Sequence, residues 1–371
     1  MATLLYRSIT GIPALVVIPD KSHSLYVIYN IPIQLQTIST SDVTHIVCGC
    51  ISPTGRILAF VTQGKRLDVY KFEEDNGWIM SYSKLIPFKS SIQSICITNS
   101  ENDLLLADKS GCVCSFQIKD SGEEICNFSS LLGHCSMLTC VKTSVNDKYI
   151  ITADSEGKLR VSNYPNAYNI HSFLLSHTEF VTHISFLPDY PNRILSGAGD
   201  GTIKLWDFEN SLLLSTLTIS NTPVYLLDVS SQGIIVVAVE GKNMLYFLTI
   251  QENTIMLLHT IELQAQPYSG CFGLNNICWI STYESFHAFT ITTEPKFNEL
   301  SVSDNPCLLY LSKHTDWCQI KKSEESKYSI LKKRTFTHEN KYYEHKQEWI
   351  EAKKRKIQSS HTPEPERPYN M

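Results

Sequence analysis

Short runs of alternating apolar and polar residues, separated by turn residues, extend over most of this chain. The clearest group lies in residues 176–207, SHTEFVTHISFLPDYPNRILSGAGDGTIKLWD, and just after them. Alternation with a period of two is typical of strands that bury one face. Turn residues at Pro188–Asn192 and Asp200–Gly201 separate the runs. The pattern predicts four consecutive strands: Phe180–Leu187, Arg193–Ala198, Thr202–Phe208 and Ser211–Ile219.

Four side chains stand at fixed places in this group of strands. His177 precedes the first strand, and Ser196 lies in the second. Asp200 opens the next turn, and Trp206 lies near the end of the third strand. His, Ser and Asp also make up a hydrolase triad, but a triad needs an exposed nucleophile beside an oxyanion site. Because each residue falls where a WD-repeat propeller blade expects it, we interpret the four as the hydrogen-bonded set that holds one four-stranded blade together.

The position of Trp206 recurs along the chain at a nearly constant interval. Strand patterns end on an aromatic residue six times, and on Ser162 where the aromatic is replaced, with spacings of 41, 46, 46, 44, 41 and 42 residues. This interval matches the ~40–45-residue period of propeller blades. The seven positions are Tyr29, Tyr70, Phe116, Ser162, Trp206, Phe247 and Phe289.

A second-strand pattern precedes each of these positions. The sequence therefore predicts an all-β fold, a seven-bladed WD-repeat β-propeller over residues 1–320. Such a ring is usually closed by a strand from one terminus, and we expect Thr3–Ser8 to pair with the last blade near Phe289–Val302. The second strands are predicted at Ala14–Ile18, Ile57–Val61, Leu104–Ala107, Tyr149–Ala153, Ile194–Ala198, Ile234–Val239 and Ile277–Ser281.

Residues 321–371 differ from the rest in charge and pattern. They hold 13 Lys and Arg against 8 Asp and Glu, whereas the preceding residues hold 19 against 29. The segment 340–357 favours a helix, and 361–371, which has three prolines, favours disorder. We predict a C-terminal basic tail with one helix. Its basic cluster is interpreted as a solubilising terminus, a nuclear import signal or a contact with RNA phosphates; it consists of Lys353, Lys354, Arg355 and Lys356.

Several other patterns exclude classes of function. The glycines at 197–201 lead into a strand, whereas a nucleotide-binding loop leads into a helix, so no cofactor site is expected. Twelve cysteines lack the spacing of a zinc site, and we expect reduced, buried thiols of a cytosolic or nuclear protein and no metal. Neither a signal peptide nor an apolar run of membrane-spanning length is apparent, so no membrane association is expected.

The unit that ends at Ser162 departs from the blade pattern. Lys158 and Arg160 alternate with Ser162 on one face of the third strand. Asp154 and Glu156 come just before them, and Lys109 occupies the matching turn of the preceding unit. These charges form either a solvated rim or a mixed-charge patch that binds a partner across two adjacent blades.

One part of the chain resembles a particular family. The segments LADKSG (106–111), GHCSML (133–138), IITADSEGKLRVSN (150–163) and SHTEFV (176–181) occur in this order. Together they are similar to the WD-repeat, non-catalytic subunit of the tRNA (guanine-N7) methyltransferase, in which a serine after Arg-Val and a lysine-rich helix after the propeller also occur. Ser176 replaces the glycine of the usual Gly-His pair, and Pro295–Lys321 follows no motif that we can place.

The resemblance implies a function without catalysis. It implies a heterodimer in which the partner carries S-adenosylmethionine and methylates a guanine in the tRNA variable loop, while this chain stabilises the partner and its tail helps to hold tRNA. It also implies location in the nucleus, with the cytoplasm as a second place. The partner interface is then expected at Lys109, Asp154, Glu156, Lys158 and Arg160. The alternatives are another interaction module, such as a ubiquitin-ligase substrate receptor or a peptide reader, and an enzyme in its own right.

Overall fold

The computed structural model describes most of the chain up to residue 313. The described residues are 2–7, 14–19, 24–29, 34–40, 44–88, 90–118, 128–273, 276–291, 297–303, 305–313, 328 and 331. The chain divides into two compact units, Met1–Lys332 and Lys333–Met371, whereas the sequence placed the boundary at residue 320. The tail helix predicted at 340–357 and the basic cluster Lys353–Lys356 lie outside the described residues.

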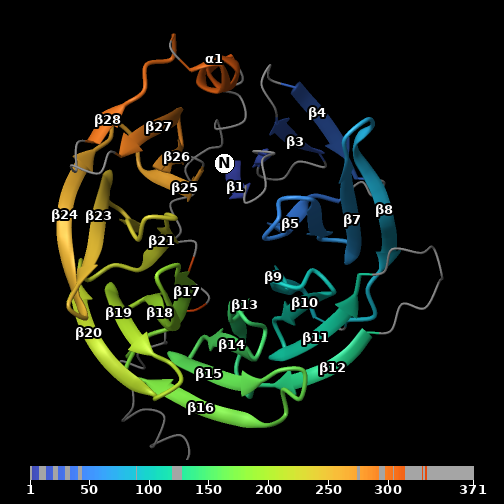
Figure 1. Cartoon of the computed structure of the whole chain (residues 1–371), viewed down its shortest axis with the longest axis vertical. Helices are drawn as coiled ribbons and strands as arrows, with labels where there is room; N and C mark the ends of the chain where they lie inside the picture. Colours follow the sequence, from blue (N-terminus) through green and yellow to red (C-terminus); the bar gives the residue numbers. More distant parts are fainter. Residues whose placement is uncertain are drawn as a thin grey trace, which may run out of the picture. The chain divides into compact units, whose positions relative to one another are not determined.

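The first unit is a ring of seven antiparallel sheets, each made of four consecutive strands (Figure 1). The prediction of a seven-bladed β-propeller is confirmed. Blades 1 to 3 contain β1 (Ala2–Arg7), β2 (Ala14–Pro19), β3 (Ser24–Tyr29), β4 (Gln34–Ser39); β5 (Ile46–Ile51), β6 (Ile57–Thr62), β7 (Arg66–Glu73), β8 (Gly77–Leu85); and β9 (Ile92–Ile97), β10 (Asp103–Asp108), β11 (Cys112–Gln117), β12 (Phe128–Gly133).

The remaining blades repeat this arrangement. Blades 4 and 5 contain β13 (Leu138–Thr143), β14 (Tyr149–Asp154), β15 (Lys158–Asn163), β16 (Ile170–Leu175); and β17 (Val181–Leu187), β18 (Tyr190–Ala198), β19 (Thr202–Asp207), β20 (Leu212–Thr218). Blades 6 and 7 contain β21 (Val224–Val229), β22 (Ile235–Val239), β23 (Met244–Gln251), β24 (Thr254–Glu262); and β25 (Pro267–Phe272), β26 (Ile277–Thr282), β27 (Phe286–Ile291), β28 (Phe297–Glu299).

The predicted strands agree with the observed ones to within one or two residues, except at β18. This strand begins at Tyr190, inside the predicted turn, because Tyr190 already pairs with Leu187. Most residues of the second strands are buried, and every residue of β6 and of β22 is. A strand that packs between neighbouring blades has two covered faces, which explains why these segments are continuously apolar.

The ring closes differently from the expectation. β1 pairs with β2 inside its own blade, from Ala2 opposite Pro19 to Arg7 opposite Ala14, and does not extend the last blade. The outer strand of blade 7 is β28, which pairs with β27. The expected pairing of Thr3–Ser8 with the last blade is therefore wrong. Since blade 7 already has a fourth strand from its own sequence, no place remains there for β1.

A short helix, α1 (Pro306–Ser312), contacts the first and last blades instead. Its buried Leu308 and Leu311 belong to one apolar cluster with Leu15 and Val17 of blade 1 and Trp279 of blade 7. Figure 1 shows α1 beside the joint between these blades. Side-chain packing thus seals the joint. In the part of the chain that the structure describes, no helix is long and apolar enough to cross a membrane.

All blades run in the same sense, so corresponding turns lie on the same face of the ring. We call this the turn face: it carries the turns from the second to the third strand of each blade, such as Asp108–Gly111 and Asp154–Gly157, and the loops that enter each first strand. Gly157 has φ +85°, and a Cβ there would lie 2.8 Å from the carbonyl oxygens of His177 and Glu179. Only glycine therefore allows this turn to pack against the loop of the next blade.

Candidate partner-binding site

The four residues that define blade 5 form a chain of hydrogen bonds on the turn face. His177 Nδ1 lies 3.0 Å from Asp200 Oδ2, and His177 Nε2 lies 2.7 Å from Ser196 Oγ. Trp206 Nε1 donates to the same Ser196 oxygen at 2.8 Å. A neutral imidazole that donates from Nδ1 satisfies every partner, because the Ser196 hydroxyl then donates to Nε2 and accepts from the indole. The set joins β18 and β19, the turn between them and the loop that enters β17.

The ionisation of this set predicts how blade 5 responds to acid. Burial lowers the pKa of His177 below its ordinary value of 6.5, although the Asp200 carboxylate opposes this. Burial alone raises the pKa of Asp200, but hydrogen bonds from His177, Thr202 and Thr178 outweigh it and lower that pKa. Below about pH 6.5 the unfolded chain therefore binds a proton at His177 that the folded chain excludes. This contribution to stability is complete above pH 6.5 and is lost as the pH falls.

We expect urea midpoints of the wild type to fall between pH 7.5 and pH 5, and the difference from His177→Gln to shrink over the same range. Glutamine does not titrate, so it serves as the matched control. A difference that stays constant with pH contradicts the neutral-imidazole assignment.

Blade 4 contains an incomplete version of the same set. His134 Nε2 lies 2.7 Å from Thr152 Oγ1, and His134 Nδ1 lies 3.2 Å from Asp154 Oδ2. Thr152 takes the place of Ser196, since each pairs with the third strand two residues before the tryptophan position. At the tryptophan position stands the fully buried Ser162. The blade therefore lacks an indole donor, and something else must fill its place.

Arg160 fills it. Its side chain is buried, and its guanidinium donates to Gly133 O and Ala167 O, both at 3.0 Å, and to Ser162 Oγ at 2.9 Å. Gly133 ends the outer strand of blade 3, whereas Ala167 belongs to blade 4. Burial lowers the pKa of Arg160. The arginine thus connects two blades, and its bonds to Ser162 and Ala167 are buried.

Asp154 is also buried and holds the turn and the neighbouring loop together. Its Oδ1 accepts from the backbone N–H groups of Glu156 and Lys158, at 2.9 and 3.0 Å. Its Oδ2 accepts from the Ser136 hydroxyl at 2.8 Å and contacts His134. Asp154 and Arg160 were predicted as contact residues. They hold the loop 133–136 in place, Asp154 through Ser136 and Arg160 through Gly133. The direct contact predicted for them stays a prediction.

The other three predicted residues are exposed on this framework. Glu156 and Lys158 form an ion pair, and their side chains keep 53% and 44% of their surface exposed. Lys109 is exposed on the turn of blade 3. That turn contacts the same loop, because His134 N donates to Gly111 O at 2.8 Å. The fold brings Lys109, Glu156 and Lys158 onto one face over two adjacent blades; we call these three residues the charged patch.

An apolar rim continues the charged patch. Leu175 of β16 pairs directly with Lys158, and Phe173 pairs with Arg160. Cross-strand partners point to the same side of a sheet. Leu175 is 64% exposed and Phe173 is 44% exposed. Charged and apolar side chains together are typical of protein interfaces.

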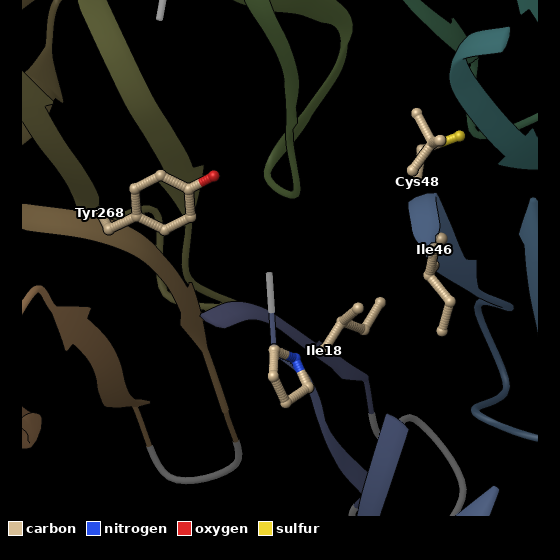
Figure 2. Close-up of a pocket in the computed structure, with 7 residues that line it drawn as sticks. Ile18, Ile46, Cys48 and Tyr268 are labelled. Atoms are coloured by element: carbon tan, nitrogen blue, oxygen red, sulfur yellow. The ribbon is translucent and has the colours of Figure 1, made fainter. Parts of the chain in front are cut away.

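A small pocket lies at the mouth of the central channel. Tyr268 borders it on one side, and Ile18, Ile46 and Cys48 border it on the other (Figure 2). Its volume of 70 Å³ is small beside the ~300–1,000 Å³ of typical small-molecule sites.

In the described part of the chain, no three His, Cys, Asp or Glu side chains are grouped to hold a metal. Burial raises the pKa of Cys48 to about 12, while Cys112 is exposed, contrary to the expectation of buried thiols.

Sequence reasoning missed the framework of the charged patch. His134 entered the sequence analysis only within the segment GHCSML (133–138) of the family resemblance. Its spacing to Thr152 and Asp154 repeats the order His177, Ser196, Asp200, and this repeat was the available signal. The role of Arg160 had no such signal. Strand alternation places Lys158 and Arg160 on the same face, but it does not predict which of the two side chains is buried.

Comparisons with known proteins agree with this architecture. A family profile described as the tRNA methyltransferase TRM82 WD40 domain matches residues 119–294. The wdr4 protein of Danio rerio, a "tRNA (guanine-N(7)-)-methyltransferase non-catalytic subunit", is 31% identical over 85% of this chain and 79% of its own length. The WDR4 proteins of Mus musculus and Homo sapiens carry the same description and are 35% identical over 44% of this chain, which is 38% of theirs.

A solved structure shows the fold alone. A chain in the crystal structure of a mitotic checkpoint complex matches with a TM-score of 0.63 and 14% identity, over 76% of this chain and 84% of its own. The consecutive four-stranded blades and the His177 set define a WD-repeat propeller. This chain belongs to the family of non-catalytic subunits of the tRNA (guanine-N(7)-)-methyltransferase. The resemblance found from the sequence is confirmed.

Proposed function

We propose that this chain is the scaffold subunit of a heterodimer and binds the catalytic tRNA (guanine-N7) methyltransferase subunit. The observation that carries the proposal is 31% identity to a named non-catalytic subunit over most of both chains. The partner supplies S-adenosylmethionine and the methyl transfer to a guanine in the tRNA variable loop. The proposed place of assembly is the nucleus, supported by the basic cluster Lys353–Lys356.

The proposed interface is the charged patch with its apolar rim. Glu156 and Lys158 are exposed, but hydrogen bonds from their backbone N–H groups to the buried Asp154 fix the turn. A surface held in this way loses little conformational entropy on binding. Leu175 and Phe173 supply apolar area beside it. Asp154 and Arg160 act as positioning residues for this surface.

Reversing the charge of Lys158 tests the proposal. We expect Lys158→Glu to weaken co-purification of the catalytic subunit by at least about tenfold. The new carboxylate then faces the acidic group of the partner that pairs with the lysine, and the two negative charges repel. The ring should keep its melting temperature, since the Lys158 side chain is exposed and forms an ion pair with Glu156, which is also exposed. Binding is measured by titration of the purified catalytic subunit.

Lys84→Glu is the matched control, because Lys84 is exposed on β8 of blade 2. A double exchange, Glu156→Lys with Lys158→Glu, separates two explanations. If binding depends only on the ion pair between residues 156 and 158, the exchange restores it. If the partner contacts each charge directly, binding stays weak. Equal binding by Lys158→Glu and the wild type rejects this surface as the interface.

A further inference from the structure

Two residues beyond the seventh blade, Tyr328 and Leu331, lie against the propeller. Tyr328 is 8% exposed and belongs to a buried apolar cluster made mainly by blades 6 and 7. Leu331 packs against the same cluster, and its N–H donates to Tyr328 O at 2.8 Å. A single turn thus presents two apolar side chains to the ring. The sequence pattern gave no sign of this contact.

The neighbours of Tyr328 come from three consecutive blades. Its ring lies 5.3 Å from that of Phe180, which precedes β17 of blade 5. The apolar cluster that contains Tyr328 also includes Tyr225 of blade 6 and Phe272 of blade 7. Burial raises the pKa of Tyr328, and the charges of Glu240 and Tyr268 raise it further. Glu240 follows β22 of blade 6, and Tyr268 lies at the start of β25 of blade 7. We call this place the tyrosine slot.

The tyrosine slot is built into the fold. A Cβ on Gly199 would lie 2.5 Å from the Phe180 ring, so the glycine makes room for that ring. Phe180 stands at the edge of the turn face and yet is only 1% exposed. Large aromatic side chains at the end of a strand are covered only when something packs over them. Tyr328 is a residue of this chain that does so.

The tyrosine slot and the charged patch lie on the same face of the ring. Phe180, Glu240 and Tyr268 are all at the ends of strands that meet the turn face, as are Lys109, Glu156 and Lys158. The slot covers blades 5 to 7, whereas the charged patch lies on blades 3 and 4. The chain reaches Lys333, where the second unit begins, two residues after Leu331.

We propose that Tyr328 and Leu331 dock the chain into the tyrosine slot and so anchor the base of the basic tail on the face that binds the catalytic subunit. Tyr328 is then a positioning residue for tRNA. This role rests on the proposed function, whereas the docking itself does not. Anchoring shortens the free length of the tail, which raises the effective concentration of its basic residues near RNA bound by the partner.

Tyr328→Ala in the full chain tests the anchor. We expect trypsin to cut after Lys332 and Lys333 at least about tenfold faster than in the wild type, because these bonds adjoin the docked turn. In complex with the catalytic subunit, we expect tRNA affinity to fall about five- to tenfold, with the affinity between the two subunits unchanged. Tyr328→Phe, which keeps the ring, should stay within about twofold of the wild type in both measurements.

Tyr168→Ala is the matched control, because Tyr168 is exposed on blade 4. Equal trypsin rates for Tyr328→Ala and the wild type overturn the docking. Faster cleavage with unchanged tRNA affinity overturns the positioning role, and so does loss of subunit binding along with tRNA binding. A wild-type chain that fails to bind the catalytic subunit rejects the proposed function, while the trypsin comparison still decides the docking.

Discussion

Arg160→Ala is expected to lower the free energy of unfolding of the propeller by about 3 kcal/mol. The change leaves the carbonyl of the buried Ala167 and the hydroxyl of the buried Ser162 without their guanidinium donor, and it removes the bond to the exposed Gly133. A buried polar group left unpaired costs about 1–3 kcal/mol. Since Gly133 belongs to blade 3, the joint between two blades weakens as well. Thermal or urea unfolding of the purified chain measures the effect.

Lys204→Ala is the matched control for this variant. Lys204 stands at the equivalent place in blade 5, opposite Ser196, and its ammonium donates to the Thr216 hydroxyl at 3.2 Å. We expect a cost of about 1 kcal/mol or less there. Equal losses for Arg160→Ala and Lys204→Ala show that Arg160 does not replace the missing tryptophan of blade 4.

The burial of Arg160 changes how its effect on partner binding is interpreted. A variant such as Arg160→Glu places an unpaired carboxylate inside the blade, and it weakens partner binding by disturbing the loop 133–136. Loss of binding then reports damage to the fold. Lys158→Glu changes the surface and leaves these contacts in place. The two variants together separate support of the interface from contact with the partner.

Asp200→Ala is expected to cost about 4 kcal/mol, the largest loss from one residue of blade 5. One carboxylate oxygen accepts from Thr202 N at 3.0 Å and from the Thr202 hydroxyl at 2.6 Å. The other accepts from His177 Nδ1 and Thr178 N, both at 3.0 Å. Bonds to a charged group contribute about 1.5–3 kcal/mol each, but groups that act together are not additive.

Asp207→Ala provides the comparison. Asp207 is half-buried at the end of β19, where it accepts from the N–H and the amide of Asn210. These groups reach water when the carboxylate is removed, so we expect a loss of about 1 kcal/mol or less. The melting temperatures of both variants and the wild type give the measurement. A loss for Asp200→Ala no larger than for Asp207→Ala contradicts a structural role of the set.

The sequence was sufficient to predict the blades because each blade repeats the same local pattern. Strand alternation and the recurrence of Trp206 at a constant interval located the second and third strands of every blade. β18 starts earlier than predicted because Tyr190 lengthens a hairpin that the Pro188–Asn192 turn residues were expected to interrupt. Local patterns of this kind carry information about elements within one blade.

Contacts between distant segments were not predictable in the same way. The helix α1 was not predicted, although Asn305 caps its start: Asn305 Oδ1 accepts from Cys307 N at 2.9 Å. What α1 packs against depends on Leu15 and Trp279, which are far away in sequence. The expected closing strand at Thr3–Ser8 was wrong for the same reason: a strand pattern does not name its partner strand.

Depth below the surface was the other missing quantity. Lys158 and Arg160 lie on the same side of β15 and are both basic. Lys158 is nevertheless exposed, whereas Arg160 is buried. Packing of the loop 133–136 over Arg160 decides this, and that loop comes from the preceding blade. The five interface residues were thus predicted as a group, but the sequence did not show that Asp154 and Arg160 are buried.

The way the ring closes determines the order in which its blades can fold during synthesis. Each blade consists of four strands that are consecutive in the chain, and β1 stays in its own blade. Every sheet can therefore be completed while the ribosome is still making the next one, and domains synthesised from the N-terminus fold in that direction. A propeller closed by strand exchange must instead leave its first strand unpaired until the last blade emerges. Here the joint at α1 has to wait for the end of the ring.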